Sequence, residues 1–165
     1  MKTRYIHRAA VQARQTKTQV GPTPFAIAAN RAAKLQPDEL AAIIRPTTAS
    51  INALIAGQGT HDDWSITRGA HLIALAIERS GIVCGQLPAL DQAGQTLGAI
   101  FARAVDGGQW HAPAVTAIEA QALLFLRDLF RGQLQHVSRG ELSRISKKAE
   151  AQLRAQGLHI ERKAA

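Results

Sequence analysis

GAHLIALAI, residues 69–77, is apolar on nearly every side of a helix. A helix of that kind belongs in the middle of a protein core. Thr60 predicts where it starts, because a threonine caps a helix N-terminus and the acids Asp62 and Asp63 in the first turn offset the helix dipole. Glycines at 81 and 85 predict its end. The stretch therefore predicts a buried central helix.

On both sides of this stretch the strong apolar periods are also helical. Helix starts are predicted at Pro24 after Thr23, at Pro37, at Pro88, at Pro113 and at the capping box Ser138-x-x-Glu141. Pro46 predicts a kinked helix or two stacked helices. The buried faces expected on these helices are Leu40, Ile43, Ile44, Ile51, Leu54 and Ile55; Leu90, Ala93, Leu97, Ile100, Phe101 and Ala104; Ile118, Ala122, Phe125, Leu126 and Leu129; and Leu142, Ile145, Ala149 and Leu153.

No segment shows the two-residue alternation that is typical of a half-buried strand. The sequence therefore predicts an all-α fold, a single compact helical bundle of five or six helices with a basic N-terminal arm. Three segments are expected: the basic arm over residues 1–22, the helical domain over 23–157, and a short basic C-terminal tail over 158–165.

The net charge of +8 is spread unevenly along the chain. Residues 1–37 carry seven basic side chains and no acid, residues 38–137 have a net charge of −3, and residues 138–165 have a net charge of +4. A mildly acidic body with two basic ends is a charge layout that favours negatively charged partners.

Cys84 is the single cysteine, which excludes an intramolecular disulfide and suits a reducing compartment. Its apolar neighbours predict a buried thiol. No run is long and apolar enough for a membrane span, and the basic start lacks the apolar core of a secretory signal. A cytoplasmic protein is the default expectation, and a mitochondrial presequence over the first residues is the lesser alternative.

Catalytic and metal-binding signatures are not evident. No phosphate-binding loop, nucleophile elbow, metalloprotease helix or zinc pattern is present, so we expect a non-enzymatic protein with no cofactor and no metal. His61-Asp62-Asp63 suggests a metal cluster, but adjacent helical residues point in different directions, and capping explains the acids better. His71 suggests a hydrogen-bonded core histidine or, alternatively, a functional switch.

The last helix separates its side chains into two faces. Its apolar residues gather on one side, and the opposite side presents the cations Arg144, Lys147, Lys148 and Arg154. With the arm's Lys2, Arg4, Arg8, Arg14 and Lys17, these are the candidate residues for binding nucleic acid or another partner. Basic side chains of this kind contact phosphates rather than bases.

Trp110, in the loop GGQWHAP, has two open interpretations. It is either an exposed anchor for a partner protein or a side chain that folds back to cover the core. Gly94 and Gly98, one turn apart, suggest that a neighbour approaches that helix closely.

The stretch HDDWSITRGAHLIALAIERSGIV, residues 61–83, resembles small helical accessory proteins of prophages, plasmids and integrative elements. The resemblance brings no catalytic residues. It implies an accessory protein of a mobile element that engages nucleic acid or a nucleoprotein complex through its basic termini. The alternative is a protein-directed inhibitor or adaptor of a host nucleoprotein machine, similar to anti-CRISPR proteins.

Overall fold

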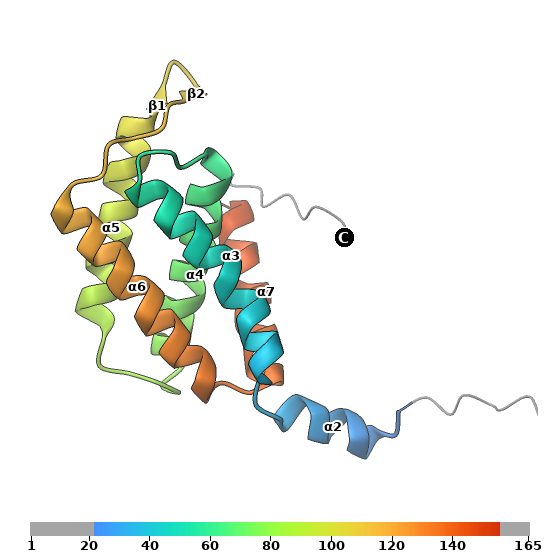
Figure 1. Cartoon of the computed structure of the whole chain (residues 1–165). Helices are drawn as coiled ribbons and strands as arrows, with labels where there is room; N and C mark the ends of the chain where they lie inside the picture. Colours follow the sequence, from blue (N-terminus) through green and yellow to red (C-terminus); the bar gives the residue numbers. More distant parts are fainter. Residues whose placement is uncertain (1–21, 156–165) are drawn as a thin grey trace, which may run out of the picture.

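The computed structural model describes residues 22–155, which form a single helical bundle (Figure 1). The predicted all-α class is confirmed, since six helices account for most of the described residues. The arm cations from Lys2 to Lys17 and the predicted tail at 158–165 lie outside the described residues. The helices are α2 (Pro24–Ala32), α3 (Pro37–Ile55), α4 (His61–Arg79), α5 (Leu87–Ala104), α6 (Ala117–His136) and α7 (Arg139–Ala155).

The central helix is α4, as GAHLIALAI predicts. It packs against α3, α5, α6 and α7, and its Ala74 and Ile77 are completely buried. Its start also agrees with the prediction, because the Thr60 hydroxyl accepts the Asp63 backbone N–H while the Asp63 carboxylate accepts the Thr60 N–H. The two reciprocal bonds satisfy donors that a helix N-terminus otherwise leaves unpaired.

Helix α3 continues through Pro46 as one helix instead of splitting into two. Proline has no N–H to donate to the carbonyl of Ala42, four residues earlier. At the next residue, the Thr47 hydroxyl donates to the Ile43 carbonyl at 3.2 Å. Ile51 and Leu54, beyond the proline, are completely buried, so packing against the core extends along the helix past Pro46.

Two expectations for α6 are wrong. The helix begins at Ala117 rather than at Pro113, because Thr116 and Glu119 form a capping box that Pro113 cannot supply. The side of α6 that faces the core also differs from the predicted side. Ile118 is 72% exposed and Phe125 is 43% exposed, whereas Leu126, which the prediction included, is buried.

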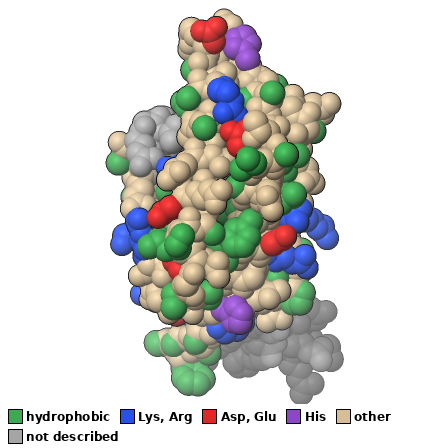
Figure 2. Space-filling model, turned by 90° about the vertical axis from the view of Figure 1, so that its left-hand side faces the viewer, with side chains coloured by type: hydrophobic (Ala, Val, Ile, Leu, Met, Phe, Trp, Pro, Cys, Tyr) green, Lys and Arg blue, Asp and Glu red, His purple; other side chains and the backbone are tan. Residues whose placement is uncertain are grey.

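The physical reason is that α6 carries two apolar stripes and only one can face the core. The stripe that extends furthest along the helix is buried, and it comprises Leu123, Leu126, Phe130 and Leu134. The competing stripe stays at the surface, and Figure 2, viewed from the side where α5 and α6 lie, shows hydrophobic side chains gathered on this face.

The expectation of a buried Cys84 is wrong, because its side chain is exposed. Cys84 lies in the connection between α4 and α5, directly before Gly85, whose φ is 106°. The buried Glu78 carboxylate accepts the N–H groups of Gly85 and Gln86 at 2.6 and 2.7 Å. These bonds fix the path of the loop, and its neighbours Ile82 and Val83 pack against the core in place of the thiol.

A short hairpin that the sequence did not predict connects α5 to the following segment. Strand β1 (Val105–Asp106) pairs antiparallel with β2 (Gln109–Trp110) around two glycines with positive φ. Two-residue strands are too short to produce a visible alternation of apolar and polar residues, so no sequence signal indicated them.

Candidate functional site

Helix α7 presents one face to the core and one to solvent, as its pattern predicts. Ala149 is buried against Leu72 of α4. Arg144, Lys147 and Lys148 are exposed, and none of the three forms a salt bridge with another described residue. The predicted capping box at the start of α7 is present, because the Glu141 carboxylate accepts the Ser138 N–H at 2.8 Å.

Helix α2 lies against the first turns of α7 at the lower end of the bundle (Figure 1). Part of this contact is between backbones, where the Arg139 N–H donates to the Ala33 carbonyl at 2.9 Å. Gly140 allows this approach, since a Cβ there would lie 3.0 Å from the Arg31 carbonyl oxygen. The α2–α7 contact brings together residues that are more than a hundred positions apart in the chain.

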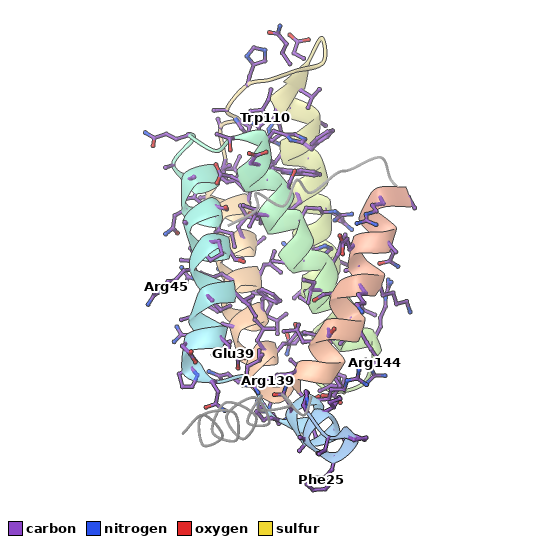
Figure 3. The ribbon with its side chains drawn as sticks, turned by 90° about the vertical axis from the view of Figure 1, so that its right-hand side faces the viewer. Phe25, Glu39, Arg45, Trp110, Arg139 and Arg144 are labelled. Atoms are coloured by element: carbon purple, nitrogen blue, oxygen red, sulfur yellow. The ribbon has the colours of Figure 1, made fainter. Side chains whose placement is uncertain are left out.

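This contact creates a groove of about 650 Å³, which we call the α2–α7 groove. Its cations without a salt bridge among the described residues are Arg31 from α2 and Arg144 and Lys147 from α7. Asn30 and Ser143 add polar side chains to its lining. Figure 3 shows Arg144 on α7 beside the end of the bundle where α2 lies.

Arg139 lines the same groove but is already paired. Its guanidinium donates to the Glu39 carboxylate at 2.8 Å and also to the Asn30 side-chain oxygen. The hydrogen bond from Arg139 lowers the pKa of Glu39 below its usual range, with the Gln36 N–H adding to the effect. This ion pair connects α3 to the start of α7, so the role of Arg139 in the groove is structural.

Glu141 is the acid that lines the α2–α7 groove. Hydrogen bonds from the Ser138 backbone and hydroxyl lower the pKa of Glu141, and the charges of Lys34 and Arg144 act in the same direction. Its carboxylate is therefore ionised and engaged in capping α7. The groove keeps an excess of positive charge.

A second groove, the α4–α7 groove, lies between α4 and α7 and has a volume of about 390 Å³. Arg79 and Lys148 are exposed at its edges, and Arg144 lines both grooves. Arg31 and Arg79 were not among the predicted site residues. They belong to helices distant from α7 in the chain, and only the packing brings them to it.

The remaining predicted residues lie elsewhere. Arg154 forms a salt bridge with Glu150 at 2.8 Å and lines neither groove. The indole N–H of Trp110 donates to the Gly59 carbonyl at 2.8 Å, and its ring lies against those of His61 and Phe101. This geometry favours the interpretation of Trp110 as a cover over the core rather than as an exposed anchor.

His71 and the stretch His61-Asp62-Asp63 were the other candidates, and the structure gives His71 and Asp63 structural roles. His71 is buried, and its Nε2 lies 2.8 Å from the Leu90 carbonyl oxygen while Nδ1 lies 3.2 Å from the Arg68 guanidinium. This is the hydrogen-bonded core histidine of the first interpretation. Asp63 caps α4, and among residues 22–155 no group of three His, Cys, Asp or Glu side chains could hold a metal ion.

No protein-family model, curated protein or solved structure matches this chain. Across the described part of the chain, none of the helices has the length and apolar character needed to span a membrane. The function must therefore be inferred from the charges and contacts of the chain itself.

Proposed function

We propose that this is a non-enzymatic accessory protein that binds nucleic acid, alone or within a nucleoprotein complex, through contacts to the phosphate backbone. The observation that carries the proposal is the α2–α7 groove, where Arg31, Arg144 and Lys147 have no salt bridge among the described residues. Cations that replace the counterions of phosphates release those ions, and this release favours binding.

The lining of the groove suits phosphates better than bases. Side chains such as Asn30 and Ser143 commonly contact phosphate oxygens alongside arginine and lysine. None of the described residues that line the groove is aromatic, so they offer no surface on which an unpaired base could stack. We therefore propose binding with little sequence preference.

The arm adds to this proposal through its position in the chain. Its five cations directly precede α2, the helix that forms one wall of the groove. In the proposal they extend the phosphate contacts beyond the groove, in the cytoplasm of the cell that carries the mobile element. The alternative, a protein-directed inhibitor or adaptor, is favoured by a different feature, the α4–α7 groove.

The test is a pair of charge-matched double variants. R31Q/K147Q removes two cations of the α2–α7 groove, and R45Q/R131Q removes two exposed arginines from α3 and α6. Figure 3 shows Arg45 projecting from α3 on the opposite side of the view from Arg144. Both variants lower the net charge by the same amount, so total charge cannot explain a difference between them.

Binding to a labelled duplex is measured by fluorescence anisotropy over a range of salt concentrations. For R31Q/K147Q we expect weaker binding and a log–log salt slope about 1.8 shallower, which is about 0.9 for each lost phosphate contact. R45Q/R131Q should bind nearly as well as the original protein. If both variants lower the affinity for the duplex equally, binding depends on the overall charge of the protein and not on the groove. That result would refute the proposal.

A further inference from the structure

The α4–α7 groove differs from the α2–α7 groove in its apolar side chains, because leucines and isoleucines line it, whereas the apolar side chains that line the α2–α7 groove are alanines. Two helical stripes form its walls, one on α4 and the other on the side of α7 that carries Glu141, Arg144, Lys148 and Gln152. The floor is made of Leu72, Leu75, Ala76, Ile82 and Ile145. Apart from Leu72, these floor residues are only half-buried, so their apolar surface is still in part open to a ligand.

The rim of this groove is cationic on both walls. Arg79 projects from the end of α4 and Lys148 from α7, both exposed and both without a salt bridge to any residue within 22–155. Glu141 is the acidic residue in the lining, and its carboxylate is held by Ser138. A ligand for this groove therefore combines apolar groups with negative charge.

We propose that the α4–α7 groove binds an acidic amphipathic helix of a partner protein. In this mode apolar side chains on one face of the partner helix enter the groove, and acids beside them meet Arg79 and Lys148. The α4 stripe from Leu72 to Arg79 covers about 10 Å, and the α7 stripe from Glu141 to Gln152 covers about 16 Å, at about 1.5 Å per residue. That length accepts two or three turns of a helix.

Charge excludes the nearest alternative occupants. The N-terminal segment 1–37 carries seven basic residues and no acid, and residues 138–165 have a net charge of +4. Neither end of this chain, nor the same end of a second copy, complements a cationic rim. A nucleic acid supplies the negative charge, but its phosphate backbone has no apolar side chains for the floor. An acidic protein segment supplies both.

This inference goes beyond the proposed nucleic-acid binding and depends on different residues. Arg31 and Lys147 line only the α2–α7 groove, whereas Arg79 and Lys148 line only the α4–α7 groove. Either proposal can therefore fail while the other holds.

The probe is a synthetic helical peptide with leucines at positions i, i+4 and i+7 and glutamates beside them. A scrambled peptide of the same composition is the control, because it has the same charge without the apolar face. Methyl NMR spectra of the full chain are recorded with each peptide. We expect the helical peptide alone to shift the methyl signals of Leu75, Ile82 and Ile145.

Two variants then test separately how the apolar floor and the cationic rim contribute to peptide binding. A76W fills the groove and leaves every charge in place, so it should abolish peptide binding and leave duplex binding unchanged. R79Q/K148Q should weaken peptide binding about tenfold or more and reduce its salt dependence, while R31Q/K147Q should not. R79Q/K148Q changes exposed side chains only, so it serves as the test if A76W does not fold.

Three results would overturn the inference. The first is equal binding of the scrambled peptide, which would mean that charge alone is recognised. The second is methyl shifts that appear outside the groove or survive in both variants. The third is a response of the same methyl groups to decanoate or to anionic vesicles but not to the helical peptide, which would assign the groove to a lipid.

Discussion

Gly94 and Gly98 lie one turn apart on α5, and the same change to alanine should alter stability in opposite directions. In a helix interior, alanine is favoured over glycine by about 1 kcal/mol, so both substitutions begin with the same gain. The surroundings of the two positions differ. A Cβ at Gly98 meets nothing within 4 Å, whereas one at Gly94 would lie 2.9 Å from Cε1 and 3.0 Å from Nε2 of His71.

The His71 ring cannot easily move away from that new methyl group. It is buried between α4 and α5, and its Nε2 is held at 2.8 Å from the Leu90 carbonyl oxygen. Overpacking of this kind costs about 1–3 kcal/mol, and loss of the hydrogen bond adds about 1 kcal/mol. After the helix gain is subtracted, Gly94→Ala should destabilise the protein by about 1–3 kcal/mol, and Gly98→Ala should stabilise it by about 0.5–1 kcal/mol.

The assay is urea denaturation followed by far-UV circular dichroism, with the free energy of unfolding taken from the midpoint and slope. The two variants are matched controls for each other, since they share a helix, a residue type and a distance of one turn. If both substitutions stabilise the protein, the close packing of His71 against Gly94 is wrong; if both destabilise it, the open surroundings of Gly98 are wrong.

Three further predictions concern the core, the arm and pH. Ile77→Ala should cost about 2–5 kcal/mol because Ile77 is completely buried, whereas Ile73→Ala should cost less because Ile73 is half-buried; urea midpoints measure both. Deletion of residues 2–20 should leave thermal stability nearly unchanged, as measured by calorimetry, while lowering affinity for a duplex; loss of the folded state would contradict the arm interpretation. Burial lowers the pKa of His71 below the usual 6.5, so the unfolded chain binds a proton first as the pH falls. Stability should therefore decrease below about pH 6.5, and H71Q should reduce that decrease in urea titrations at several pH values; an unchanged pH dependence in H71Q would contradict it.

The sequence predicts those parts of the fold whose signals are local. Thr60 and Ser138 mark the starts of α4 and α7 correctly, because a capping box involves only residues three positions apart. The same reasoning failed at Pro113, since Thr116-x-x-Glu119 lies a few residues later and provides the stronger start. Where two local signals compete, the hydrogen bonds that each can form decide between them.

Features that depend on tertiary packing could not be predicted in this way. Ile118 and Phe125 fit a helical stripe as well as Leu123 and Phe130 do, and only the position of α6 on the core decides which stripe is buried. The thiol of Cys84 has apolar neighbours in the sequence, yet the loop turns it outward.

Only part of the candidate site can be predicted from the sequence. The cationic face of α7 follows from helical periodicity, so the exposed positions of Arg144, Lys147 and Lys148 could be predicted. Arg31 and Arg79 complete the two grooves, but each reaches α7 through packing between helices distant in the chain. A single sequence holds no periodic signal for such a pairing.

The salt dependence of duplex binding by the full chain tests the central claim most directly. The arm and the α2–α7 groove together should contact about five to eight phosphates, which predicts a slope of log affinity against log salt concentration between about −4.5 and −7. A slope between zero and about −1, or no binding at low salt, would contradict a nucleic-acid-binding function.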